Sequence, residues 1–284
     1  MTSDIDLIAN CWTIAGDFLP APGRSACPIP LEERLAAAAE AGYTGVGFFH
    51  GDLIAYLDRG GSFRALRSRL DAHGIRHVEL EYLTDWFADG ERRQRSDAIR
   101  QDLYVAADAL RARHIKVMPP FGNEGWSRQR LIDEYGELCA EAEDHNLLMP
   151  IEMIPFSDLP TLDAALSIPA GAEAANGGLL IDVWHVVRSG GCFEDIQRVP
   201  SRYLLAAEID DADRVMRGEI REDTMHHRKF CGEGDFDVPA FIAAMTRAGY
   251  RGPYGVEILS DELRRLPLAE AARRSFRTAR AQFR

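Results

Sequence analysis

The sequence predicts an α/β protein, a (β/α)8 TIM barrel formed by a single domain over residues 1–284. Short apolar runs alternate with amphipathic stretches from one end of the chain to the other, which is typical of repeated βα units and a parallel sheet. The apolar runs are nearly continuous, as expected of strands that are buried on both faces. A length of 284 residues is also typical of one barrel of this kind.

The first half of the chain is expected to hold four strands, each followed by a helix. The expected strands are residues 5–11, 45–49, 76–83 and 114–120. The expected helices are residues 31–43, 62–74, 96–113 and 127–146. Proline and glycine in "LPAPGRSACPIP", residues 19–30, indicate a loop before the first helix.

The second half repeats the pattern. Its expected strands are residues 147–152, 178–182, 203–208 and 254–259. Its expected helices are residues 159–168, 193–199, 238–250 and 268–283. Residues 210–235 are rich in charge and poor in apolar periodicity, so we expect a long loop there. An open doubly wound sheet is the alternative, but no GxGxxG or GxxxxGK[ST] motif follows the first strand.

Four acidic residues each end one of the last four expected strands: Glu152, Asp182, Glu208 and Glu257. A single carboxylate at a strand end is commonly the N-cap of the next helix. Four on consecutive strands converge on one end of a closed barrel, the end at which TIM-barrel active sites lie. Carboxylates this close repel one another strongly, so the pattern predicts a bound divalent cation with oxygen ligands.

Other side chains follow the same strand ends. His185 comes three residues after Asp182, and Arg228 lies in the expected long loop. We expect His185 to hold a substrate oxygen and Arg228 to stabilise an anionic intermediate. Further candidates for the walls of a sugar-sized pocket or for substrate contacts are Trp12, Phe48, Phe49, His50, Glu81, Trp86 and Trp184.

Composition excludes several classes of protein. The formal net charge of −12 argues against a nucleic-acid or anionic-membrane partner, because both require a basic face. Five scattered cysteines without a CxxC pair favour reduced thiols over disulfides or zinc–thiolate sites. With no signal peptide and no membrane-length apolar run, a cytoplasmic location is expected. The sequence is compatible with a homo-oligomer but does not decide the oligomeric state.

The chain resembles the xylose-isomerase-like TIM-barrel superfamily, which includes sugar isomerases and epimerases, inosose and dehydroshikimate dehydratases and the endonuclease IV type of DNA-repair enzyme. The resemblance spans nearly the whole chain. It rests on Glu152 and on the motifs "DVWH", "RKFCGEGDFD" and "GYRGPYGVEILS". It implies that Glu152, Asp182 and Glu257 bind a metal ion, while His185 and Arg228 contact substrate.

One position departs from the family pattern. The ligand on the seventh strand is usually histidine or glutamine, whereas this chain has Glu208. Four carboxylates around one divalent cation leave about two excess negative charges, which raises the pKa of at least one of them. Glu208 is therefore a variant oxygen ligand, a protonated hydrogen-bonded acid, or the mark of a weakened or lost metal site.

These features predict an isomerase or epimerase that acts on a sugar or cyclitol with one divalent ion, Mn2+, Mg2+ or Co2+. Glu152 and Glu257, on different strands, are the expected proton-transfer groups, and an enediolate is the expected intermediate. A metal-dependent dehydratase of inosose or 3-dehydroshikimate type uses the same parts and remains open. A non-catalytic sugar-binding protein with a decayed metal site is the alternative from another class. The DNA-repair activity needs a multi-zinc cluster with several histidines, which the eight histidines of this chain do not suggest.

Overall fold

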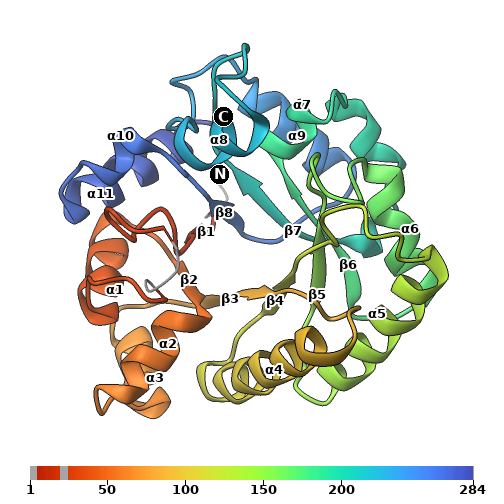
Figure 1. Ribbon diagram of the computed structural model, residues 1–284. Helices are drawn as coiled ribbons and strands as arrows, with labels where there is room; N and C mark the ends of the chain where they lie inside the picture. The colour runs from red at the N-terminus through yellow and green to blue at the C-terminus, as the bar shows by residue number, and fades with distance from the viewer. Residues whose placement is uncertain (1–4, 20–24, 284) are drawn as a thin grey trace.

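The computed structural model describes residues 5–19 and 25–283 and confirms the predicted TIM barrel. Eight parallel strands close into a ring in sequence order, and the helices surround them (Figure 1). The strands are β1 (Leu7–Ala9), β2 (Gly45–Phe49), β3 (His77–Leu83), β4 (His114–Val117), β5 (Met149–Glu152), β6 (Gly177–Asp182), β7 (Leu204–Ile209) and β8 (Tyr254–Val256).

The helices alternate with these strands along the chain. They are α1 (Leu31–Ala41), α2 (His50–Asp58), α3 (Phe63–Ala72), α4 (Gly90–Leu110), α5 (Arg128–Glu143), α6 (Leu162–Ala172), α7 (Val183–Arg188), α8 (Ile220–His226), α9 (Val238–Arg247), α10 (Asp261–Arg264) and α11 (Leu268–Arg280). Two 3-10 helices, η1 (Phe193–Arg198) and η2 (Ser201–Tyr203), precede β7. Within the described residues, no helix is both long and apolar enough to span a bilayer.

Several expected elements differ from the structure. Residues 193–199 were expected to form a short helix, and Phe193–Arg198 do so as the 3-10 helix η1. The sequence also gave no expectation of α2, α7 or α10, which are short helices that begin at or shortly after a strand end. Short helices carry too few turns for a clear apolar period, and their stability comes from tertiary packing. Residues 210–235 are not entirely loop, because they include α8.

Strand register aligns the acidic strand ends. Asp182 on β6 pairs with Glu208 on β7, and Glu208 pairs with Gly255 on β8. A Cβ atom at Gly255 would lie 2.8 Å from Cγ of Glu208, so only glycine leaves room for this carboxylate to cross β8. The parallel register therefore gathers the last strands' carboxylates at the C-terminal mouth of the barrel.

The segment between β7 and α9 is fastened by one buried carboxylate, Asp211. Its two oxygens accept hydrogen bonds from four backbone N–H groups, those of Ala212, Gly232, Gly234 and Phe236, over 2.8–3.0 Å. These bonds tie the two ends of residues 212–236 together, and α8 lies between them. We call residues 212–236 the β7–α9 segment.

Replacing Asp211 should loosen this segment. In Asp211→Asn, an amide NH2 group replaces one oxygen and faces two backbone donors, so we expect a loss of about 2–3 kcal/mol in the free energy of unfolding. Urea denaturation of the purified protein measures it. Asp235→Asn is the matched control, because Asp235 is exposed and accepts one backbone bond from Arg214. Equal midpoints for the two variants would contradict the anchoring role.

Candidate functional site

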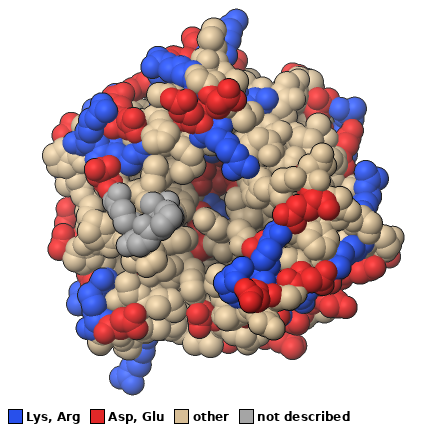
Figure 2. Space-filling model, viewed as in Figure 1, with Lys and Arg blue, Asp and Glu red and all other residues tan. Residues whose placement is uncertain are grey.

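A cavity of about 430 Å³ opens at the C-terminal end of the barrel. Figure 2 shows a hollow near the middle of this face, with acidic side chains visible inside it and basic side chains at its rim. The cavity is lined by Trp12, Leu19, Glu81, Tyr82, Thr84, Met118, Phe121, Glu152, Ile154, Phe156, His185, Arg221, Thr224, Met225, Arg228, Glu257 and Leu259. Its volume suits a ligand of sugar size.

The four strand-end carboxylates lie together beside this cavity. Glu152, Asp182, Glu208 and Glu257 each offer one oxygen, and these oxygens lie within 4.8 Å of one another. Asp182 and Glu208 are almost completely buried, and Glu152 and Glu257 are each 6% exposed. Asp182 is also the N-cap of α7, since it accepts a 2.6 Å hydrogen bond from the backbone of Trp184. The capping function and membership of the cluster thus coexist in one residue.

Arg228 crosses one side of the cluster. Its guanidinium donates to Asp182 over 2.7 Å, contacts Asp210, and lies 3.1 Å from Oε2 of Glu257. Thr224, one turn earlier, accepts two further bonds at 2.9 and 3.2 Å. Burial opposes the charge on Arg228, but Asp182, Asp210 and Glu257 outweigh it and raise its pKa well above the usual value. Arg228 is therefore a fixed cation that also lines the cavity.

His185 is paired with a carboxylate from the neighbouring strand. Its Nε2 lies 2.8 Å from Oε1 of Glu152, and its ring stands edge-on to Trp184 with centroids 5.2 Å apart. The other ring nitrogen, Nδ1, is buried and has no partner among the described residues. His185 thus orients Glu152 and keeps one nitrogen free for a ligand.

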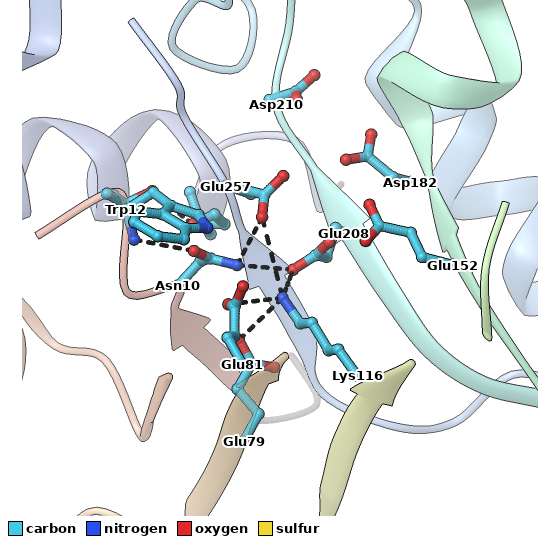
Figure 3. A network of polar contacts seen from close by, with 12 residues as sticks. Asn10, Trp12, Glu79, Glu81, Lys116, Glu152, Asp182, Glu208, Asp210 and Glu257 are labelled. Carbon is cyan, nitrogen blue, oxygen red and sulfur yellow. Dashed lines mark hydrogen bonds and ion pairs between the residues drawn. The ribbon is translucent and has the colours of Figure 1, made fainter. Parts of the chain in front are cut away.

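Lys116, which the sequence reasoning missed, reaches the same cluster from β4. Figure 3 shows its ammonium group between Glu81 and Glu208. Nζ lies 2.9 Å from Glu81, 3.5 Å from Glu79 and 4.0 Å from Glu257, and it contacts Glu208 directly. A charged residue inside the apolar run "HIKVM" is the signal that could have identified it, because lysine is almost never buried without a partner.

Asn10, just after β1, is a second residue that was missed. Its side-chain amide donates to Glu208 and to Glu257, over 2.9 Å in each case. It is fully buried, so these bonds hold the two carboxylates at a fixed separation. A polar residue directly after the run "LIA" was the available signal in the sequence.

The site holds more negative than positive charge. Among the described residues, two buried cations, Lys116 and Arg228, face seven buried carboxylates, those of Glu79, Glu81, Glu152, Asp182, Glu208, Asp210 and Glu257. Burial and the neighbouring acids raise the pKa values of Glu208, Asp210 and Glu257 well above the usual range. Burial also opposes ionisation of Asp182, but Arg228 outweighs it and lowers the Asp182 pKa. Protons or a further cation must therefore compensate part of this charge.

The residues fit a divalent cation. Oε2 of Glu208 is buried and accepts no hydrogen bond from the described residues, although Oε1 of the same group has two donors. An unpartnered buried carboxylate oxygen is costly unless a ligand satisfies it. Together with oxygens from Glu152, Asp182 and Glu257 it gives an all-oxygen set, which is the preference of hard divalent ions such as Mg2+ and Mn2+.

Only some of the other residues expected in the pocket line the cavity. Trp12 and Glu81 line the cavity. Phe48, Trp86 and Trp184 do not, because they are buried in the hydrophobic core. Phe49 lies behind the wall, with its ring 5.3 Å from that of Trp12. His50 does not line the cavity and is directed to Asp102 on α4, 2.9 Å away, so the structure places it outside the candidate site.

The comparisons with known proteins agree with this geometry. A sequence profile described as xylose isomerase-like TIM barrel matches residues 35–282. The IOLI protein, solved in a crystal with a binding zinc atom, superposes with a TM-score of 0.85 over 98% of this chain and 98% of that chain, at 18% identity. That likeness concerns the fold.

Two curated relatives are enzymes. A 3-dehydroshikimate dehydratase of Pseudomonas aeruginosa is 27% identical over 255 residues, which is 84% of this chain and 37% of that protein. An inosose isomerase of Bacillus subtilis is 24% identical over 149 residues, which is 52% of this chain and 52% of that protein. This chain thus spans little more than a third of the dehydratase and matches about half of the isomerase.

Removing the buried lysine should destabilise the barrel. In Lys116→Met, Glu208 and Glu81 lose their cation inside the protein, and we expect the free energy of unfolding at pH 8 to fall by about 3–5 kcal/mol. Lys229→Met is the control, because the only other lysine of the chain makes a partly exposed ion pair with Asp213, for which about 1 kcal/mol or less is expected. Urea unfolding of both variants gives the comparison. A Lys116→Met protein as stable as wild type would disprove the charge-compensating role.

The stability of protein stripped of divalent ions should fall as pH rises. Burial and the neighbouring acids raise the pKa values of Glu208, Asp210 and Glu257 in the folded state above the usual values of 4.5 and 3.8, so the folded state binds more protons than the unfolded chain as the pH rises past those values. His114, whose pKa burial lowers from 6.5 to about 4, opposes this trend only below pH 6.5. Between pH 6.5 and 8 we therefore expect the free energy of unfolding to fall as the pH rises.

Thermal and urea unfolding at a series of pH values, with a chelator present, measure how steeply the stability depends on pH. Glu208→Gln should flatten this dependence, because one of the three titrating acids is gone. Excess Mn2+ should also flatten it by neutralising the ionised carboxylates. Stability that rises between pH 6.5 and 8 in the chelated protein would contradict the excess negative charge.

Proposed function

The chain belongs to the xylose isomerase-like TIM barrel family, and we propose that it is a divalent-metal-dependent isomerase or epimerase acting on a sugar or cyclitol. The observation that carries the proposal is the group of four carboxylates whose oxygens lie within 4.8 Å of one another beside a sugar-sized cavity. Such a group is strongly self-repelling without a cation. Its all-oxygen composition favours Mn2+, Mg2+ or Co2+.

We assign Glu152, Asp182, Glu208 and Glu257 as the ligands. Asn10 and Lys116 both donate hydrogen bonds to Oε1 of Glu208 and leave its Oε2 available to a metal ion. This arrangement supports the inclusion of Glu208 among the ligands. When bound, the metal ion would polarise a substrate carbonyl and its neighbouring hydroxyl, which acidifies the adjacent C–H bond. Lys116 removes part of the excess charge that distinguishes this site from one with a neutral fourth ligand.

Proton transfer is assigned to Glu152 and Glu257. Glu152 stands on β5 with His185 bonded to it, so its carboxylate is held in one orientation for removal of a proton. Glu257 follows β8, and Asn10 and Arg228 fix it. Two carboxylates that approach a substrate from different strands suit removal of a proton on one side and its return on the other, which is epimerisation. A single carboxylate that moves the proton between two carbons gives isomerisation.

The substrate contacts are assigned to His185 and Arg228, which both line the cavity. The free Nδ1 of His185 is available to a substrate hydroxyl. Arg228 places positive charge where an enediolate would develop negative charge. Its three acidic partners keep it charged and immobile during the reaction.

A dehydratase is the second candidate, because a curated dehydratase matches 84% of this chain and the isomerase only 52%. The same enediolate loses a β-hydroxyl group in that reaction. Incubation with 3-dehydroshikimate and Mn2+ decides between them, since dehydration yields an aromatic product with strong ultraviolet absorbance. A constant spectrum would count against this candidate.

Deuterium exchange tests the shared proton-transfer step. The protein with Mn2+ is incubated in D2O with D-allulose, scyllo-inosose or 3-dehydroshikimate, and NMR follows deuterium entering next to the carbonyl. Glu152→Gln and Glu257→Gln should each slow the exchange by about 10²–10⁴-fold, because each removes a proton-transfer group. Glu143→Gln, on the exposed face of α5, is the control and should leave the rate unchanged.

Metal binding gives an independent check. Titration of metal-free protein with Mn2+ should show one site, and Glu208→Gln should retain it while Asp182→Asn weakens it. Absence of both Mn2+ binding and deuterium exchange would overturn the enzyme proposal and favour a non-catalytic sugar-binding protein.

A further inference from the structure

We propose that the substrate carries a carboxylate group, and that Arg221 at the cavity rim binds it. This inference rests on the proposed function, because it concerns the same cavity. It adds the chemical class of the substrate, a sugar acid or a cyclitol acid, and a specificity residue that is separate from the proposed metal ligands.

Arg221 is a cation without a partner. It lies on α8 within the β7–α9 segment and lines the cavity. Its guanidinium forms neither an ion pair nor a hydrogen bond anywhere in residues 5–19 and 25–283. Among the described residues that line the cavity, the other arginine is Arg228, which is shared among three carboxylates. Arg221 is therefore the wall residue with positive charge to offer to a ligand.

Two aromatic rings hold Arg221 in place. Its guanidinium carbon lies 4.8 Å from the ring centre of Phe156 and 5.5 Å from that of Phe121. The two rings are stacked with centroids 5.9 Å apart and an interplanar angle of 27°. They come from the loops that follow β4 and β5, so three loops meet at this point. Cation–π contacts orient the guanidinium without using its N–H donors, which stay free for an anion.

The residues that line the cavity differ in exposure, and this difference indicates the orientation of such a substrate. Glu152 and Glu257 at the bottom are each 6% exposed, Phe121 and Phe156 are half-buried, and Arg221 is exposed. Figure 3 shows the acidic groups that converge at the bottom. A substrate carboxylate is repelled by these acids and attracted by Arg221. The carbonyl and hydroxyl end would therefore enter first, and the carboxylate end would remain at the rim.

The charges favour a carboxylate over a phosphate. One guanidinium offers two parallel N–H donors, which match the two oxygens of a carboxylate. A dianionic phosphate usually needs several donors, and Arg228 is fully engaged with its own acids. A neutral sugar would leave Arg221 without a function, although among the described residues that line the cavity it is the cation with no acidic partner.

Binding of matched acid and neutral ligands tests the proposal. Calorimetry on the 284-residue protein with Mn2+ compares shikimate with methyl shikimate, and D-glucuronate with D-glucose. At least one acid should bind about tenfold or more tightly than its neutral counterpart. Arg221→Gln should remove this preference and leave the neutral ligand's affinity unchanged, while Arg221→Lys should keep part of it. Arg128→Gln is the matched control, because Arg128 is also exposed and likewise unpaired among the described residues, but lies outside the cavity.

Three outcomes would overturn the proposal: equal affinity for both members of each pair, no binding of either acid, or an acid preference that survives in Arg221→Gln. Tighter binding of fructose 6-phosphate than of both acids would assign the rim to phosphate instead and would also overturn it. Titration with Mn2+ alone separates this proposal from the proposed function. Normal Mn2+ binding with no acid preference overturns the carboxylate inference only, whereas an acid preference without Mn2+ binding overturns the metal-dependent function only.

Discussion

The concentration of buried negative charge at one end of the barrel is the constraint on which the rest of the site depends. Parallel strands in register bring Asp182 and Glu208 side by side, and Glu257 lies next to them. Two cations oppose the repulsion. Arg228 spans Asp182, Asp210 and Glu257, while Lys116 reaches Glu208 from inside the barrel. The remaining imbalance is the physical reason that the site has a use for a metal ion.

Lys116 also accounts for the departure at Glu208. A carboxylate in place of a neutral ligand adds one negative charge, and the lysine on β4 supplies one positive charge in contact with it. The pair explains how an acidic residue is accommodated at a position where the resemblance leads us to expect histidine or glutamine. Glu208 on β7 and the cation on β4 are therefore parts of one arrangement.

The sequence predicted the barrel and the acidic cluster because both depend on local patterns. Apolar runs define the strands, and a carboxylate at the end of a run is visible in the chain itself. Lys116 and Asn10 were missed, since their partners are 92 and 198 residues away and no local rule connects them. Arg221 was missed for a related reason. Its importance comes from what it lacks, an ion-pair partner, and from two rings on other loops, and neither fact can be read from its neighbours in the sequence.

The anchoring of the β7–α9 segment by Asp211 has a consequence for the cavity wall. Its hydrogen bonds with four backbone N–H groups hold the two ends of residues 212–236 together. The residues between these ends therefore form an insertion that is anchored at its base. Arg221, Thr224 and Arg228 all lie on that insertion. A change at Asp211 would therefore act on the cavity wall at a distance, through the position of these three residues and not through the strands.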